Sequence, residues 1–230
     1  MNGYAGYIDD VRTKDTGKEL RMDTQHYFDL LREIRDTSMA TVAGDGTPRI
    51  RIIDTMLTKN EKLYFLTARG KDFYQELMRT GQVAVTGLNE RWETVRLQGK
   101  VRNIGHECLD EIFEKNPSMN SVYPGDSREI LEVFCLYEGQ GEYFCLADHP
   151  IVRKQFCFGN VPLQQRGYRI GADCIGCGTC VSVCPQGAVE EGTPFRIRQE
   201  NCLHCGRCFE NCPVQAIVPA DGGCGDSEEA

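Results

Sequence analysis

The sequence predicts a mainly β domain that is followed by a small α+β domain made of two similar βαβ repeats. Three observations lead to this fold class. Residues 23–158 hold many short segments in which apolar and polar residues alternate, and only a few stretches with helical spacing. Eight of the 13 cysteines lie between Cys174 and Cys212. The segment that contains them repeats itself at an offset of 28 residues.

The composition is that of an ordinary globular protein, because 40% of the 230 residues are hydrophobic and 26% are charged. The 34 acidic residues outnumber the 26 basic ones, and the net charge of −8 argues against nucleic acids and anionic membranes as partners. The longest run without a charge, 174–189, is rich in cysteine and glycine, so no membrane span is predicted. The first residues lack the basic and apolar segments of a secretory signal, and we therefore expect a cytoplasmic protein.

The elements of the first domain follow an N-terminal extension over residues 1–22. An amphipathic helix is predicted over residues 23–36, because apolar residues recur there three and four positions apart. Two further helices are predicted over residues 71–80 and 106–115. Alternation and flanking turn residues predict strands at 38–43, 49–57, 63–68, 82–88, 91–104, 130–138 and 142–147. The last two strands are expected to form a hairpin through Gly139 to Gly141, and the many short strands predict a barrel.

The cysteines of the second domain are expected to bind metal. A cytoplasmic protein keeps its thiols reduced, so a disulfide framework is not predicted. Residues 174–189, CIGCGTCVSVCPQGAV, match residues 202–217, CLHCGRCFENCPVQAI, at seven of sixteen positions. The identities are the four cysteines, one glycine, one proline and one alanine. This pattern indicates a duplicated metal-binding unit.

Each copy has the spacing C-x2-C-x2-C-x3-C-P, by which thiolates hold 4Fe-4S clusters. Three closely spaced cysteines bind one cluster, and the cysteine before proline binds the other. The spacing therefore predicts two clusters with crossed ligands. One set is Cys174, Cys177, Cys180 and Cys212, and the other is Cys202, Cys205, Cys208 and Cys184. The alternatives are free thiols or paired zinc sites, although zinc sites usually present two C-x2-C pairs.

His204 lies between two of these ligands, and it is either a residue that tunes the second cluster or a solvated turn residue. Residues 168–219 resemble the bacterial two-cluster ferredoxins. The resemblance implies two small βαβ repeats, with short strands at 168–170, 195–197 and 217–218. Residues 159–167 are then a linker, and residues 220–230 form a polar tail.

Four segments of the first domain resemble, in order, the FMN-binding split-barrel family that includes pyridoxamine 5'-phosphate oxidase. They are ATVAGDGTPRIRIID, LYFLTARGKDFYQEL, QVAVTGLN and VRLQGKVRNI. The resemblance covers residues 23–158. It implies a homodimer with an FMN in each of two clefts between the subunits.

The resemblance also implies which residues bind FMN. Arg51, in the pattern P-x-x-R, matches an arginine that lies against the flavin phosphate. Leu66 and Thr67 match the segment along the isoalloxazine, and Lys71 matches a basic residue that binds the phosphate. The turn before Lys71 is shorter than in the oxidase, so Arg69 either replaces a second phosphate arginine or faces water. The oxidase's C-terminal arginine motif is missing, which makes pyridoxamine phosphate a poor substrate candidate.

The two resemblances together predict an oxidoreductase that relays single electrons between two 4Fe-4S clusters and FMN, which then reduces or oxidises a small molecule. A redox partner such as ferredoxin is expected, and the oxygen sensitivity of such clusters suggests an anaerobic cell. No acid–base constellation stands out, so no catalytic side chain is assigned. The alternatives are a non-catalytic electron carrier or redox sensor, and a barrel that holds haem or a deazaflavin.

Overall fold

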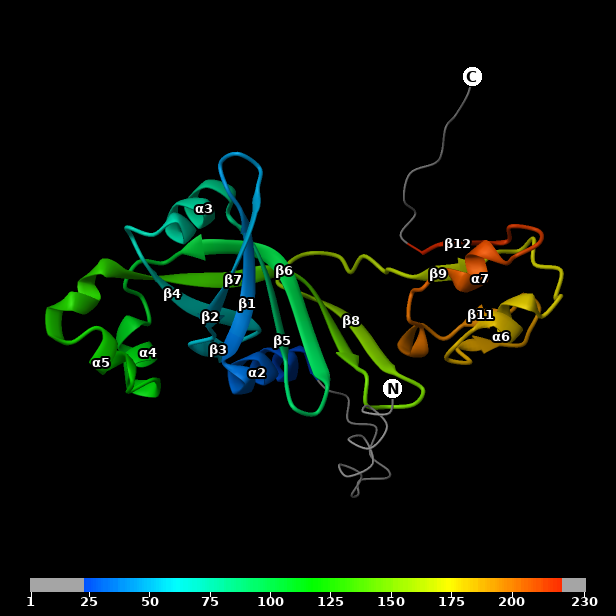
Figure 1. Cartoon of the computed structure of the whole chain (residues 1–230), viewed down its shortest axis with the longest axis horizontal. Coiled ribbons are helices and arrows are strands. Elements are labelled where there is room, and N and C mark those ends of the chain that lie inside the picture. The colour runs from blue at the N-terminus through cyan, green and yellow to red at the C-terminus, as the bar shows by residue number, and fades with distance from the viewer. Residues whose placement is uncertain (1–22, 221–230) are drawn as a thin grey trace, which may run out of the picture. The chain divides into compact units, whose positions relative to one another are not determined.

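The computed structural model describes residues 23–220, which fall into two compact units (Figure 1). Of the described residues, the first unit comprises 23–143 and 156–162, and the second comprises 144–155 and 163–220. None of the helices in this described part is long and apolar enough to cross a membrane.

These units differ from the sequence-based division in two respects. The predicted linker, 159–167, is divided between them after residue 162. Residues 144–155, which the sequence assigns to the first domain, group with the second unit. The predicted extension over residues 1–22 lies outside the described residues, as do residues 221–230 of the predicted tail.

The first unit is built on a largely antiparallel sheet of eight strands, which confirms the mainly β fold predicted for this part. The strand order is β2-β1-β5-β6-β7-β4-β3, and β8 pairs with β7. Buried and more exposed residues alternate along β1 and β5, so each of these strands has one face in the core. The strands are β1 (Asp36–Val42), β2 (Pro48–Asp54), β3 (Leu57–Lys59), β4 (Lys62–Ala68), β5 (Gln82–Leu88), β6 (Glu93–Asn103), β7 (Leu131–Cys145) and β8 (Val152–Phe158).

The predicted hairpin through Gly139 to Gly141 is wrong, because β7 continues through these glycines. The backbones of β6 and β7 approach so closely that a Cβ atom on Gly139 would overlap with the carbonyl oxygen of Gln98. Glycine is needed there because no side chain fits, and not because the chain turns. The turn lies instead between β7 and β8.

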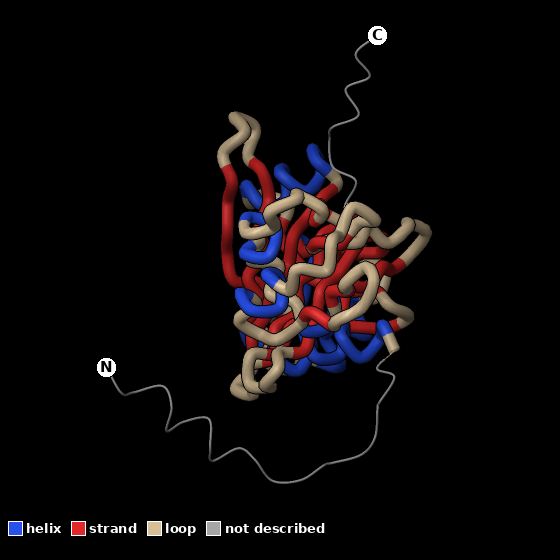
Figure 2. Tube along the Cα trace, turned by 90° about the vertical axis from the view of Figure 1, so that its right-hand side faces the viewer, coloured by secondary structure: helices blue, strands red, loops and turns tan. Residues whose placement is uncertain are grey.

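Short helices accompany the sheet, as the blue segments of Figure 2 show. The helix α2 (Thr24–Ile34) begins after Asp23, whose carboxylate accepts the backbone N–H of His26 and so caps the first turn. The other helices of this unit are α3 (Asp72–Thr80), α4 (Leu109–Lys115), α5 (Met119–Val122) and the 3-10 helix η2 (Gly125–Ile130).

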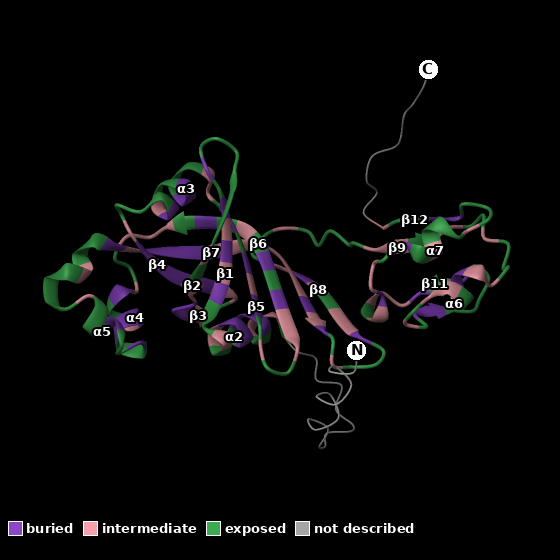
Figure 3. Cartoon of the chain, viewed as in Figure 1, coloured by how far each residue is buried: buried purple, intermediate pink, exposed green. Residues whose placement is uncertain are grey.

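The core of the first unit is aromatic and aliphatic. The ring of Phe65 on β4 stacks against the rings of Phe73 on α3 and Phe134 on β7. Both strands are largely buried, as the purple colour of β4 and β7 shows in Figure 3. Burial of these large side chains supplies much of the favourable free energy of folding for this unit.

The second unit has two small sheets, two short α-helices and one 3-10 helix. Its strands β9 (Tyr168–Ile170) and β12 (Ile217–Pro219) pair antiparallel, as do β10 (Val189–Glu190) and β11 (Arg196–Ile197). Its helices are α6 (Thr179–Val183), α7 (Arg207–Glu210) and the 3-10 helix η3 (Gln199–Asn201). This arrangement confirms the small ferredoxin-like fold predicted for the second domain.

Hydrogen bonds tie the segment 144–155 to the rest of the second unit. The backbone N–H of Ile151 donates to Oε1 of Gln186 at 3.1 Å, and its carbonyl accepts from Nδ2 of Asn201 at 2.8 Å. Because these partners are 35 and 50 residues away along the chain, local sequence patterns do not reveal this grouping.

Candidate cluster and cofactor sites

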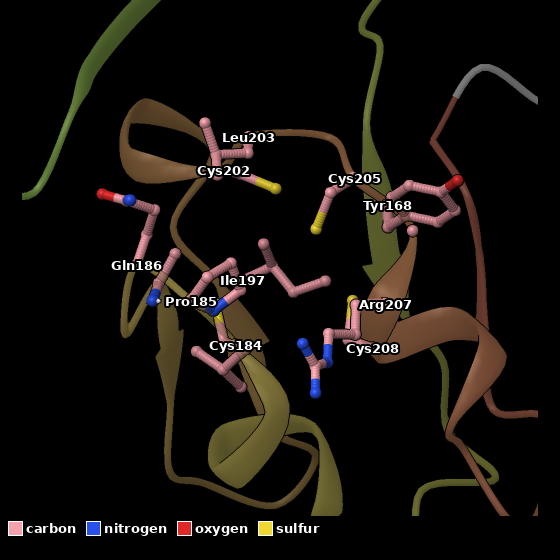
Figure 4. A pocket seen from close by; sticks show the side chains of 13 residues that line it. Tyr168, Cys184, Pro185, Gln186, Ile197, Cys202, Leu203, Cys205, Arg207 and Cys208 are labelled. Carbon is pink, nitrogen blue, oxygen red and sulfur yellow. Dashed lines mark hydrogen bonds between the residues drawn. The ribbon is translucent and has the colours of Figure 1, made fainter. Parts of the chain in front are cut away.

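Four cysteines surround one pocket of the second unit (Figure 4). We call it the second pocket, because three of these cysteines belong to the second sequence copy. Cys202 and Cys205 lie on the loop before α7, and Cys208 lies within that helix. The fourth, Cys184, follows the end of α6 and belongs to the other sequence copy.

The other four cysteines line another pocket of this unit, the first pocket. Cys174, Cys177 and Cys180 come from the first copy, and Cys212 comes from the second. In each copy, the cysteine before proline therefore lies with the three cysteines of the other copy. These are the two sets that the crossed spacing predicts.

Local backbone structure explains how the cysteines reach these positions. Gly178 and Gly206 precede α6 and α7 with φ angles of 75° and 78°, a left-handed conformation that glycine adopts without strain. The backbone N–H groups of Ala188 and Ala216 each donate to a cysteine sulfur at 3.3 Å. Four sulfurs around each space, with N–H donors directed at them, fit the ligand shell of a 4Fe-4S cluster.

Two cysteines of the second pocket, Cys208 and Cys202, hold their protons more tightly than an ordinary thiol. Burial raises the pKa of the Cys208 thiol to about 11, and the nearby thiolates of Cys202 and Cys184 act in the same direction. Burial also raises the pKa of Cys202. Since iron binds the thiolate form, occupation of this site releases protons.

His204 stands beside the second pocket and is not a solvated turn residue. Its Nε2 atom is buried, and its Nδ1 atom lies 2.8 Å from Nη1 of Arg153. Burial lowers the pKa of His204 to about 4, and the charges of Arg153 and Arg166 add to this effect. The imidazole is therefore neutral near pH 7, and Nδ1 accepts a hydrogen bond from Arg153.

The residues assigned to FMN lie on β2, on β4 and at the start of α3. Leu66 and Thr67 are buried near the end of β4, opposite Val133 and Glu132 of β7. The Oγ1 atom of Thr67 is buried and has no hydrogen-bond partner among the described residues. A buried hydroxyl without a partner is costly, so a bound ligand atom at this position would satisfy it.

Lys71 is exposed at the position that precedes the first residue of α3. A cation at a helix N-terminus, together with the free backbone N–H groups of the first turn, fits a phosphate group. Arg69, in contrast, does not simply face water, because its Nη1 atom pairs with Glu132 at 3.3 Å.

The guanidinium of Arg51 already makes hydrogen bonds to other residues of the chain. Its Nη1 atom donates to Oγ1 of Thr41 at 2.6 Å, and its Nη2 atom donates to Glu76 at 2.8 Å. Burial tends to raise the pKa of Glu76, but the hydrogen bonds from Thr41 and Arg51 outweigh it and keep that pKa below its ordinary value. A phosphate at Arg51 would have to share the guanidinium with this carboxylate.

Glu76 and Thr41 are not predicted from the sequence as part of this site. A signal for Glu76 existed, because it falls on the apolar face of α3 with Phe73 and Leu77. A charged residue on a buried helix face is usually paired, and here the partner is Arg51.

Comparison with known proteins matches both parts of the chain. Residues 23–130 match the family described as pyridoxamine 5'-phosphate oxidase, and residues 173–216 match the 4Fe-4S dicluster domain. No curated protein sequence matches the chain.

Solved structures resemble the first part. A NimC/NimA family protein from Clostridium acetobutylicum is 24% identical with a TM-score of 0.50, and the match covers 56% of this chain and 88% of that chain. A pyridoxamine 5'-phosphate oxidase-related, FMN-binding protein from Nostoc punctiforme is 15% identical with a TM-score of 0.44, covering 60% and 87%. The first of these likenesses supports the fold alone.

Both resemblances drawn from the sequence are thus confirmed, and the combination indicates a redox protein. The chain joins a split-barrel domain of the pyridoxamine 5'-phosphate oxidase-like family to a 4Fe-4S dicluster domain of the ferredoxin type.

Proposed function

We propose that this protein is an iron-sulfur flavoprotein oxidoreductase, in which single electrons pass between two 4Fe-4S clusters and an FMN that reduces or oxidises a small molecule. The observation that carries the proposal is the division of eight cysteines into two sets of four, each around its own pocket, in a chain that also has a split barrel. When bound, the clusters exchange electrons singly, and FMN exchanges them singly or in pairs.

The residues of the chain bind and orient these groups. We assign the two sets of cysteines to the two clusters, with the N–H donors of Ala188 and Ala216 stabilising charge on the sulfurs. Thr67 offers its hydroxyl to FMN, Leu66 packs against it, and Lys71 binds its phosphate. Arg51 has guanidinium donors beyond the two that contact Thr41 and Glu76, and these remain for the phosphate.

The experiment that tests the proposal starts from protein purified without oxygen. We expect about eight iron atoms per chain and a flavin whose extracted mass is that of FMN. A soluble redox protein such as ferredoxin should reduce the bound flavin, and a small-molecule acceptor should reoxidise it in repeated turnovers. Electron exchange with proteins but with no small molecule would indicate a carrier or a sensor. Extraction of haem or a deazaflavin would contradict the FMN assignment.

Thr67→Val is expected to have opposite effects on FMN binding and on stability. Valine keeps the shape but removes a buried hydroxyl that lacks a partner, so the free energy of unfolding of the flavin-free protein should rise by about 1 kcal/mol. The Kd for FMN should rise about fivefold because a hydrogen bond to the ligand is lost. Flavin fluorescence titration and urea unfolding measure the two effects.

Thr86→Val is the matched control for this substitution. The Oγ1 atom of Thr86 donates to the carbonyl of Val95 at 3.1 Å. Its loss should therefore destabilise the protein and leave the Kd for FMN unchanged. An unchanged Kd in Thr67→Val would remove Thr67 from the FMN site.

We also propose that the protein forms a homodimer through the open edge of the sheet. The edge strand β2 exposes two isoleucines, Ile50 at 73% and Ile52 at 61%. Ile50→Glu places a charge on this edge and should raise the dimer Kd about 100-fold, because a buried unpaired charge is costly. Sedimentation velocity measures this change. Val122→Glu on α5, where the valine is 65% exposed, should leave the dimer intact. A monomeric wild type would contradict the proposal.

A further inference from the structure

The two cysteine-lined pockets differ in the charge around them. Arg207 lines the second pocket, and Arg153 lies beside His204, which stands between two of its cysteines. None of the described residues that line the first pocket is charged. The duplication makes the comparison direct, because at an offset of 28 residues Thr179 corresponds to Arg207 and Gly176 to His204. The positive charge is therefore a feature of one copy and not of the repeat.

A short series of contacts connects Arg153 to a cysteine sulfur. Nη1 of Arg153 lies 2.8 Å from Nδ1 of His204, whose backbone N–H donates to Sγ of Cys202 at 3.4 Å. Arg153 belongs to the segment 144–155 that groups with the second unit. An arginine side chain brings a guanidinium cation to such a contact. Arg153 is therefore the cation of this contact.

A cation close to a cluster affects its two redox states differently. Reduction adds one negative charge to the site, and a nearby positive charge stabilises the reduced form more than the oxidised form. The effect is larger where water is excluded, and the His204 side of the second pocket is partly buried. Arg207 acts in the same direction, but it is exposed to solvent and more strongly screened.

We infer that the cluster of the second pocket has the higher reduction potential of the two, and that Arg153 raises it. This inference rests on the proposed function. An electron supplied by the redox partner then resides mainly at the second pocket. When it moves there from the first pocket, the first cluster is oxidised by one electron and the second is reduced by one. Arg153 is a positioning residue, because it acts through its charge and through His204 and does not touch a substrate.

The test is a redox titration of the anaerobic holoprotein, followed by electron paramagnetic resonance. The wild type should show two one-electron steps of unequal potential. Arg153→Gln should lower the upper step and leave the lower step unchanged. We expect at least a tenfold change in the equilibrium constant for electron exchange between the clusters, which is about 59 mV for one electron. Arg153→Lys should retain most of the upper potential, because it keeps the charge.

Two further variants separate charge from structure. Lys154→Gln removes a charge from the next residue of β8, which is exposed and points to the opposite side of the strand, so both steps should keep their potentials. Arg207→Gln should lower the same step as Arg153→Gln. The inference is overturned if Arg153→Gln moves neither step, moves both equally, or moves only the lower one. If the wild type shows no iron-sulfur signals at all, the proposed function fails instead.

Discussion

The substitutions Cys184→Ala and Cys202→Ala are expected to remove the same cluster. Cys174→Ala should remove the other one. Cys184 and Cys174 belong to the same sequence copy, yet Cys184 lines the second pocket with Cys202, and Cys174 lines the first. Each single variant should lose about half of the iron, because a cluster that lacks one thiolate ligand is not retained. Iron and sulfide analysis of anaerobically purified protein measures this loss.

The double variants decide whether the ligands cross. Cys184→Ala combined with Cys202→Ala should still contain about half of the wild-type iron, because both changes damage the same site. Cys184→Ala combined with Cys174→Ala should contain almost none, because it damages both. Cys108→Ala, a cysteine of the first unit that lines neither pocket, controls for the loss of a thiol alone. The reverse pattern in the doubles would show that each sequence copy holds its own cluster.

The cysteine sites were the most predictable part of this protein. The ligands of a cubic cluster must follow a fixed spacing, so a duplicated C-x2-C-x2-C-x3-C-P pattern carries the geometry in the sequence itself. Amphipathic helices were also predictable, and α2 and α3 lie within two residues of their expected ends. In both cases the information is local.

Features that depend on distant parts of the chain could not be predicted. Gly139 indicated a turn, but its role is set by the backbone of β6 about 40 residues earlier. The pairing of Arg51 with Glu76 joins a strand to a helix, and the choice of partner depends on the fold. The grouping of residues 144–155 with the second unit depends on single hydrogen bonds to Gln186 and Asn201. None of these leaves a periodic pattern.

Removal of iron is expected to unfold the second unit and to leave the first unit folded. The core of the second unit is small, and it includes two of the proposed ligands, Cys180 and Cys202, among its buried residues. Its strands β9, β10, β11 and β12 contain only two or three residues each. Such a core buries too little apolar surface to offset the loss of conformational entropy, so the clusters must supply the difference.

Hydrogen exchange measured with and without iron tests this expectation. Protection of the backbone amides of residues 163–220 should fall at least 100-fold when a chelator removes the iron at acid pH. Returning the iron-free protein to neutral pH should not restore this protection. The amides of β4 and β7 should keep their protection, because Phe65 and Phe134 pack in a core that contains no cysteine proposed to bind iron. Return of iron and sulfide should restore protection more completely as the pH rises, since the cysteine thiols must lose their protons to bind iron. A second unit that stayed protected without iron would mean that its peptide core is sufficient, and that the clusters serve electron transfer alone.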